Sequence, residues 1–207
     1  MHPLFQRHFA ECPLVAIIRG VTPDEAEAIG EAIYEGGIRI IEVPLNSPEP
    51  LKSIERLAKR MGDRALVGAG TVLDTRQVAD VKAAGGQLIV SPNTNTDVIA
   101  ASAQAELVSC PGYFTPSEAF AAIEAGAHAL KLFPAEAATP AFVKAQRAVL
   151  PKDLPILIVG GVKPELMGAW LEAGANGFGL GSGVFKPGNS AAEVLENSRS
   201  YVSALRR

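Results

Sequence analysis

Three chargeable side chains occur in or directly after apolar segments of this 207-residue chain: Lys131, Glu42 and Arg19. Burial lowers the pKa of a lysine by up to about 3–5 units, and the neutral amine is the form that attacks a carbonyl carbon. Glutamate can move protons during such a reaction, and arginine can bind a carboxylate through two parallel hydrogen bonds. If one fold brings the three side chains together, they predict Schiff-base chemistry on a keto acid.

Each of these residues also has an ordinary structural interpretation. Lys131 could lie at a strand end and extend its ammonium group to solvent. Glu42 could be a carboxylate at the rim of the fold, and Arg19 could be a loop residue that interacts with a helix end. The choice depends on whether the elements that carry them direct the three side chains to one place.

Eight short apolar segments, separated by helical patterns, predict the strands that position these residues. The segments are Leu14–Ile18, Ile38–Val43, Ala65–Ala69, Gln87–Ser91, Leu107–Cys110, Ala127–Leu132, Ile156–Val159 and Asn176–Leu180. Thr22–Glu25 and Thr115–Glu118 each combine an N-cap threonine, a proline and a capping-box glutamate, which predicts helix starts. Strict alternation of strands and helices implies a parallel sheet, and eight such units imply a closed (β/α)₈ TIM barrel. We expect a single domain over residues 1–207.

Residues along a barrel strand alternate between the interior and the helices, and active sites lie at the carboxyl ends of the strands. If Lys131 points inward, Leu130 and Leu132 face the helices. The same alternation directs Glu42 inward and allows Arg19 to follow the first strand into the mouth. The barrel hypothesis therefore predicts that the three charged side chains converge.

Glycines end the seventh and eighth predicted strands. Gly160 and Gly161 follow Val159, and Gly181 and Ser182 follow the last strand. Loops in these two positions, with a short extra helix, commonly bind phosphate in barrels, and we expect Gly181 and Ser182 to begin that helix. A dinucleotide fingerprint would belong after the first strand instead. Simple tight turns are the alternative.

The third and fourth predicted strands end in segments with weaker signals. Thr71 follows the small residues Gly68, Ala69 and Gly70 at the end of the third strand and could bind a substrate carboxylate by a hydrogen bond. Ser91–Asn93 ends the fourth strand. Both segments are equally compatible with plain turns.

Composition excludes several classes of function. A formal net charge of −3 without a basic cluster argues against nucleic acid as the partner. No apolar run has the roughly 18–20 residues of a membrane span, and the first residues lack the pattern of a signal peptide. Two cysteines (Cys12 and Cys110) form no disulfide framework, which favours the cytoplasm. The three histidines (His2, His8 and His128) lack metal-binding spacing, so we expect neither a metal nor another cofactor.

Four stretches together resemble the 2-keto-3-deoxy-6-phosphogluconate/galactonate aldolase family. They are Ile41–Leu45, Val67–Val72, Lys131–Glu136 and Gly160–Val162, and they occur in the family's order over nearly the whole chain. The resemblance implies a metal-independent class I aldolase with a (β/α)₈ barrel, usually homotrimeric. It implies that Lys131 forms the Schiff base and that Glu42 is the acid/base. Gly160, Gly161, Gly181 and Ser182 match the phosphate-binding positions.

Within that family the chain is more similar to the phosphogalactonate branch. Arg19 stands where it could replace an arginine that the phosphogluconate branch places near Asn46. Val159 occupies a position where the phosphogluconate branch typically has threonine, and this change could alter the choice of C4 epimer. The resemblance therefore implies reversible cleavage of 2-dehydro-3-deoxy-6-phosphogalactonate to pyruvate and D-glyceraldehyde 3-phosphate, with Arg19 and Thr71 on the carboxylate.

Three alternatives remain open at this point. The enzyme could prefer the gluconate epimer or accept both epimers. It could be a phosphate-binding barrel enzyme that works without an imine. It could also be a non-catalytic phosphosugar-binding protein, although phosphate binding alone would require neither Lys131 nor Glu42.

Overall fold

Nine strands and nine α-helices occur in residues 2–205, the part of the chain that the computed structural model describes. The strands are β1 (Leu14–Ile17), β2 (Ile40–Pro44), β3 (Leu66–Gly70), β4 (Leu88–Val90), β5 (Val108–Cys110), β6 (Gly112–Tyr113), β7 (Leu130–Leu132), β8 (Ile156–Val159) and β9 (Gly177–Leu180). The helices are α1 (Pro3–Glu11), α2 (Pro23–Glu35), α3 (Pro50–Met61), α4 (Thr75–Ala83), α5 (Thr96–Gln104), α6 (Pro116–Glu124), α7 (Pro140–Arg147), α8 (Met167–Glu172) and α9 (Ala191–Ala204). Three short 3₁₀ helices are η1 (Gly62–Arg64), η2 (Ala135–Ala137) and η3 (Pro164–Leu166).

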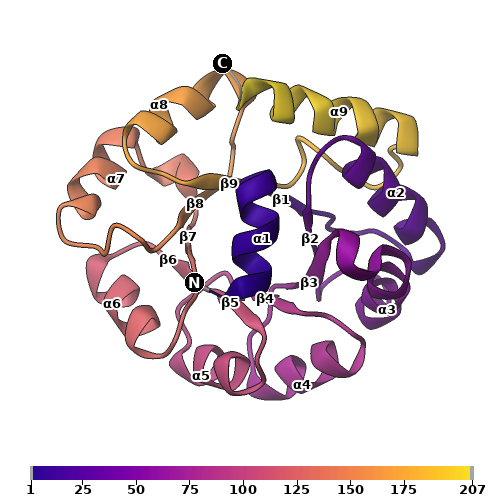
Figure 1. Cartoon of the computed structure of the whole chain (residues 1–207), viewed down its shortest axis with the longest axis horizontal. Coiled ribbons are helices and arrows are strands. Elements are labelled where there is room, and N and C mark those ends of the chain that lie inside the picture. The colour runs from indigo at the N-terminus through magenta and orange to yellow at the C-terminus, as the bar shows by residue number, and fades with distance from the viewer. Residues whose placement is uncertain (1, 206–207) are drawn as a thin grey trace.

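All strand pairs are parallel, in the order β5-β4-β3-β2-β1-β9-β8-β7-β6. The two ends of this order, β5 and β6, are separated in the chain only by Pro111. Figure 1 shows the strands at the centre of a ring formed by α2 to α9. The predicted parallel α/β architecture is therefore confirmed, as a sheet that curls into a near-closed barrel.

The predicted strand segments coincide with observed strands, with two differences. An additional strand, β6, lies beyond the predicted segment Leu107–Cys110. It is separated from β5 by Pro111, which has no N–H group to donate to a ladder. The segment predicted from Ala127 begins as a strand only at Leu130. His128 and Ala129 instead both donate backbone hydrogen bonds to the Ser109 carbonyl, at 2.9 and 3.3 Å.

Helix starts follow the capping patterns in the sequence. At α2, the Thr22 N–H donates to the Glu25 carboxylate at 2.8 Å. At α6, the Thr115 N–H donates to the Glu118 carboxylate at 2.7 Å. These local bonds satisfy N–H groups that the first turn of a helix leaves without partners, so each helix begins at the predicted residue.

Alternating side chains divide the core into an inner and an outer layer. In β2, Ile40 packs in the inner layer, whereas Ile41 and Val43 pack between the sheet and the helices. In β7, Leu130 and Leu132 also belong to the outer layer. The predicted alternation is confirmed for both strands, and it directs Glu42 and Lys131 into the barrel.

The helix α1 closes the barrel at the amino ends of the strands. Figure 1 shows α1 lying across the centre of the ring. Phe5 is fully buried in the inner layer, its ring stacks on Phe9 at 4.8 Å, and Phe9 packs near the first residue of β9, Gly177. The sequence patterns did not predict this role for the N-terminal segment.

At the other end of the chain, α9 lies beside α2 in the ring of helices (Figure 1). Ser198 of α9 is fully buried against Gly36. A helix over Glu193–Arg207 was noted in the sequence, and its last two residues lie outside the described part of the chain. Among the helices of residues 2–205, none combines the length and hydrophobicity that crossing a bilayer would need.

Candidate active site

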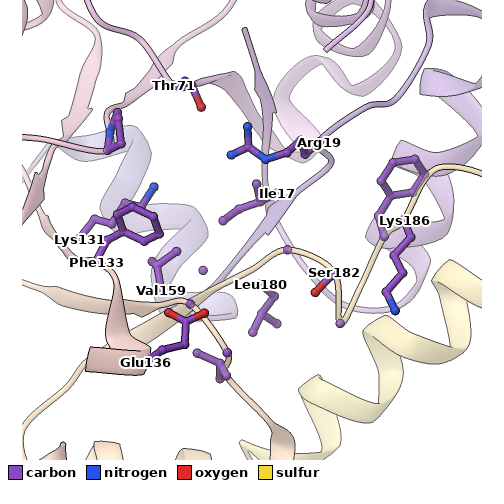
Figure 2. Close-up of a pocket in the computed structure, with 18 of the residues that line it drawn as sticks. Ile17, Arg19, Thr71, Lys131, Phe133, Glu136, Val159, Leu180, Ser182 and Lys186 are labelled. Carbon is purple, nitrogen blue, oxygen red and sulfur yellow. The ribbon is translucent and has the colours of Figure 1, made fainter. Parts of the chain in front are cut away.

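A pocket of about 390 Å³ opens at the carboxyl ends of the strands, opposite α1. Its walls come from β7, from the ends of β1, β8 and β9, and from the loops that follow these strands and β3 and β4. The residues predicted from sequence that line it are Arg19, Thr71, Lys131, Val159, Gly160, Gly161, Gly181 and Ser182. Figure 2 shows Arg19 and Thr71 on one side of the pocket, with Val159 and Ser182 on the other. The fold therefore brings together residues spread over most of the chain.

Lys131 lies at the bottom of this pocket, with 7% of its surface exposed. Desolvation by burial lowers the pKa of its ammonium group, Arg19 lowers it further, and the Glu42 and Cys110 side chains partly oppose the shift. The Phe133 ring centre lies 4.8 Å from Nζ. A lysine in this environment has a larger fraction of neutral amine than a lysine in water, as nucleophilic attack requires.

Glu42 does not line the open pocket but lies deeper inside the barrel, where it is 1% exposed. It lines a small interior void that Lys131 and Val159 also line. Burial raises the pKa of Glu42 to about 7, with Lys131 and Arg19 acting in the opposite direction. Its Oε2 atom is buried and has no hydrogen-bond partner among the described residues. A carboxyl group that changes protonation near neutral pH is suited to acid–base work.

The backbone of β3 leaves room for this carboxylate. A Cβ atom at Gly70 would lie 2.0 Å from Glu42 Oε2, so any side chain there would displace the carboxylate. The partner of Gly70 in the β2–β3 ladder is Pro44, two residues after Glu42. The small residues at the end of β3 therefore allow a buried acid to lie against the barrel wall.

Cys110 lines the same interior void. Burial raises the pKa of its thiol to about 12, with the Glu42 charge acting in the same direction and Lys131 against it. The thiol is therefore protonated at neutral pH and is a poor nucleophile there. Among the groups lining this void, Lys131 is the better candidate nucleophile.

Arg19 reaches the pocket from the loop after β1 and is hydrogen-bonded to the loop after β2. Its Nη1 atom donates a hydrogen bond to Asn46 Oδ1. The adjacent Gly20 N–H donates to Ser47 Oγ at 2.9 Å, which ties the same two loops together. The guanidinium retains further N–H groups with which it can bind an anion.

The two glycine segments line the far side of the pocket, and one detail differs from the prediction. Gly160 and Gly161 have φ values of +115° and +60°, conformations that side-chain-bearing residues rarely adopt. The helix predicted to begin at Gly181 is a single turn, in which the Phe185 N–H donates to the Gly181 carbonyl at 3.0 Å. Pro187 ends it, because the residue before a proline disfavours helical conformation.

Three further polar side chains line the pocket and were not predicted as site residues: Glu136, Lys186 and Tyr201. Glu136 follows the lysine-bearing strand and Lys186 follows a glycine loop, so their positions after barrel strands were an available signal. Tyr201 lies on α9, and its hydroxyl donates to the Val162 carbonyl at 2.9 Å. No local pattern marks a residue that reaches the site from the outer helix. Of the segment Ser91–Asn93, only Pro92 lines the pocket.

Comparison with known proteins gives a consistent result. Residues 6–196 match the model of the KDPG and KHG aldolase family. The chain is 45% identical to the 2-dehydro-3-deoxy-6-phosphogalactonate aldolase of Escherichia coli K12, over 94% of this chain and 95% of that protein. A solved structure of native KDPGal superposes with a TM-score of 0.93 at 45% identity, covering 95% of each chain.

A more distant structure contains a bound reaction intermediate. The KDPG aldolase of Legionella pneumophila, with pyruvate captured as a covalent carbinolamine intermediate, superposes with a TM-score of 0.80 at 29% identity. The superposition covers 95% of this chain and 93% of the other. The family match extends through all the strands that form the pocket described above. From these comparisons, the chain belongs to the KDPG and KHG aldolase family and is a carbon–carbon lyase.

Proposed function

We propose that the protein is a class I aldolase that cleaves 2-dehydro-3-deoxy-6-phosphogalactonate reversibly into pyruvate and D-glyceraldehyde 3-phosphate. The observation that carries this proposal is the pairing inside the barrel of Lys131, whose pKa is lowered by burial, with Glu42, whose pKa is raised to about 7. The Escherichia coli relative supports the choice of substrate.

In the proposed mechanism, the neutral Lys131 amine attacks the C2 carbonyl and forms a carbinolamine. Loss of water gives an iminium ion, which accepts the electron pair of the C3–C4 bond when that bond breaks. Glu42 moves the protons of the carbinolamine steps, directly or through water, and takes the C4 hydroxyl proton as the aldehyde forms. Protonation of the enamine at C3 and hydrolysis release pyruvate and the free lysine.

Arg19 and Thr71 are proposed to bind the substrate carboxylate at one side of the pocket. Gly160, Gly161, Gly181 and Ser182 are proposed to bind the phosphate at the other side, through backbone N–H groups and the serine hydroxyl. Holding both ends orients C2 toward Lys131, which replaces a random encounter by a fixed geometry. The hydrogen bond between Arg19 and Asn46 supports the first assignment, because it fixes the guanidinium at the pocket wall.

Val159 is proposed to determine the choice of C4 epimer. Its side chain lines both the open pocket and the interior void beside Lys131. An apolar side chain offers no hydrogen bond to a C4 hydroxyl, whereas a threonine in the same position would. Cleavage rates on the galactonate and gluconate epimers would test this assignment.

For the whole molecule, we propose a single-domain (β/α)₈ barrel over residues 1–207 that assembles as a homotrimer. Counting β5 and β6 as one barrel strand interrupted by Pro111 gives eight strands. The trimer follows from the family resemblance, and size-exclusion chromatography with light scattering would test it.

Borohydride trapping tests the central step. Incubation with pyruvate and sodium borohydride should add one reduced pyruvate to Lys131, located by mass spectrometry of peptides. The variant Lys131→Met should acquire no adduct and serves as the control. An active preparation that acquires no adduct at Lys131 would refute the Schiff-base mechanism.

A further inference from the structure

Glu136 is the carboxylate among the side chains that line the open pocket. We propose that it is a specificity-determining residue, which accepts a hydrogen bond from the substrate hydroxyl at C5, next to the phosphate-bearing carbon. This inference rests on the proposed function, because it assumes a phosphorylated hydroxy keto acid that spans the pocket.

The position of Glu136 follows from the strand that carries the nucleophile. It lies in η2, the short turn that follows β7. A Cβ atom placed on Gly160 would lie 2.1 Å from Glu136 Oε2, and one placed on Gly161 would lie 2.9 Å from its Cγ. The carboxylate therefore packs directly against the two glycines at the phosphate side of the pocket. Figure 2 shows the Glu136 side chain beside Val159.

The other charged side chains that line the pocket can only donate hydrogen bonds. Arg19, Lys131 in its ammonium form and Lys186 have no acceptor atoms. The Tyr201 hydroxyl is already directed to the Val162 carbonyl. Within residues 2–205, the hydrogen bonds and ion pairs of the structure leave the Glu136 carboxylate without a partner. The carboxylate oxygens of Glu136 are therefore available to accept a hydrogen bond from a ligand.

The proposed substrate supplies matching donors. Its carboxylate would lie near Arg19 and its phosphate near the glycines, so its two hydroxyl groups at C4 and C5 must lie between them. A hydroxyl that enters a pocket loses hydrogen bonds to water and needs an acceptor there. The proton of the C4 hydroxyl is taken up by Glu42 in the proposed mechanism. The C5 hydroxyl is the one closer to the phosphate, and Glu136 packs against the phosphate-side glycines.

The same position also brings the Glu136 carboxylate close to the substrate phosphate, which it would repel. A carboxylate beside a phosphate site weakens anion binding, because like charges repel. If repulsion were the main effect of Glu136, its removal would strengthen phosphate binding. If hydrogen bonding is the main effect, its removal weakens the reaction of hydroxylated substrates only. The two effects therefore predict opposite outcomes.

The experiment uses the synthetic direction, with pyruvate and two aldehydes. One is D-glyceraldehyde 3-phosphate and the other is 3-oxopropyl phosphate, which lacks the hydroxyl that becomes the C5 hydroxyl. Glu136→Leu should lower kcat/KM for the hydroxylated aldehyde by about tenfold or more, the usual effect of losing a hydrogen bond to a charged group. It should leave kcat/KM for the deoxy aldehyde within about twofold of wild type, so that the preference disappears. Glu136→Gln, which retains an acceptor oxygen, should give an intermediate preference.

Glu172→Leu, at an exposed position of α8, is the matched control and should keep the wild-type preference. Equal losses on both aldehydes in the two Glu136 variants would overturn the proposal, as would tighter inhibition by inorganic phosphate with an unchanged preference. Pyruvate trapping at Lys131 should persist in every variant, because pyruvate lacks the hydroxylated segment. A wild-type protein without that adduct would instead overturn the proposed function.

Discussion

The two ends of the barrel are built from the same strands but differ in what fills them. At the amino ends, α1 and Phe5 close the interior with apolar side chains. At the carboxyl ends, glycines and loops leave a pocket of about 390 Å³. The closed end removes water from around Lys131 and Glu42 and so shifts the pKa of each, whereas the open end admits the ligand. The chemistry in this molecule therefore depends on both ends of the barrel, whereas ligand binding depends on the open end.

Replacing the nucleophile should cause the largest loss of activity without a loss of stability. Lys131→Met should lower kcat for cleavage by roughly 10⁴-fold or more, as expected when a nucleophile is removed. Its free energy of unfolding should stay equal or rise, because a methionine of similar volume replaces an ammonium group that is costly to bury. Steady-state kinetics and urea denaturation measure the two effects. A variant that retained a tenth of the activity would remove Lys131 from the mechanism.

Removing an apolar side chain from the closed end should lower the stability of the protein. Phe5→Ala should lower the free energy of unfolding by about 3–5 kcal/mol, because it leaves a cavity in the inner layer. The exposed Phe120→Ala is the matched control and should change stability much less. Urea titrations of the two variants measure the difference. A similar loss in both would contradict the role of α1 as the closing element.

The buried acid should make stability depend on pH. The pKa of Glu42 is raised from 4.5 to about 7 in the folded chain, so the folded state binds this proton more tightly than the unfolded state. Its contribution is therefore complete below about pH 4.5 and is lost as the pH rises through about 7. Relative to Glu42→Gln, the wild type should lose about 3 kcal/mol of unfolding free energy over that range. Denaturant titrations at several pH values test this, and a constant difference would contradict it.

A change at the binding end should have the smallest effect. Val159→Thr adds a hydroxyl to the pocket wall and should shift the ratio of kcat/KM values for the C4 epimers toward the gluconate epimer by about tenfold. The unfolding free energy should change by about 1–2 kcal/mol, since a buried methyl becomes a hydroxyl. Competition assays with both epimers measure the ratio. An unchanged ratio would show that Val159 does not determine epimer choice.

Sequence reasoning predicted the architecture because its signals are local and repeated. Capping residues such as Thr22 and Thr115 mark helix starts, and the alternation around Glu42 and Lys131 follows from strand geometry. The role of α1 could not be found in this way. Phe5 is buried by strands distant in sequence, and a nine-residue amphipathic segment does not indicate which surface it will cover.

The candidate site was predictable to a similar degree. Residues at strand ends, such as Arg19 and Thr71, line the pocket because parallel strands place their carboxyl ends together. Tyr201 was missed because it depends on how the outer helix α9 packs. The predicted short helix at Gly181 is limited to a single turn, because Pro187 follows it closely and disfavours helical conformation in the preceding residue.

The interruption at Pro111 has a consequence for how the molecule opens. β5 and β6, of three and two residues, lie at the two ends of the sheet order and are joined in the chain by Pro111. The backbone N–H of Lys131 donates to the Pro111 carbonyl at 2.9 Å, so the strand that carries the nucleophile is bonded to this junction. Short strands form few ladder hydrogen bonds and few packing contacts, so they unfold locally at a lower free energy than long strands. On gentle heating, exchange of backbone hydrogens should accelerate there first, and catalysis should fade before the helices around the ring lose their circular dichroism.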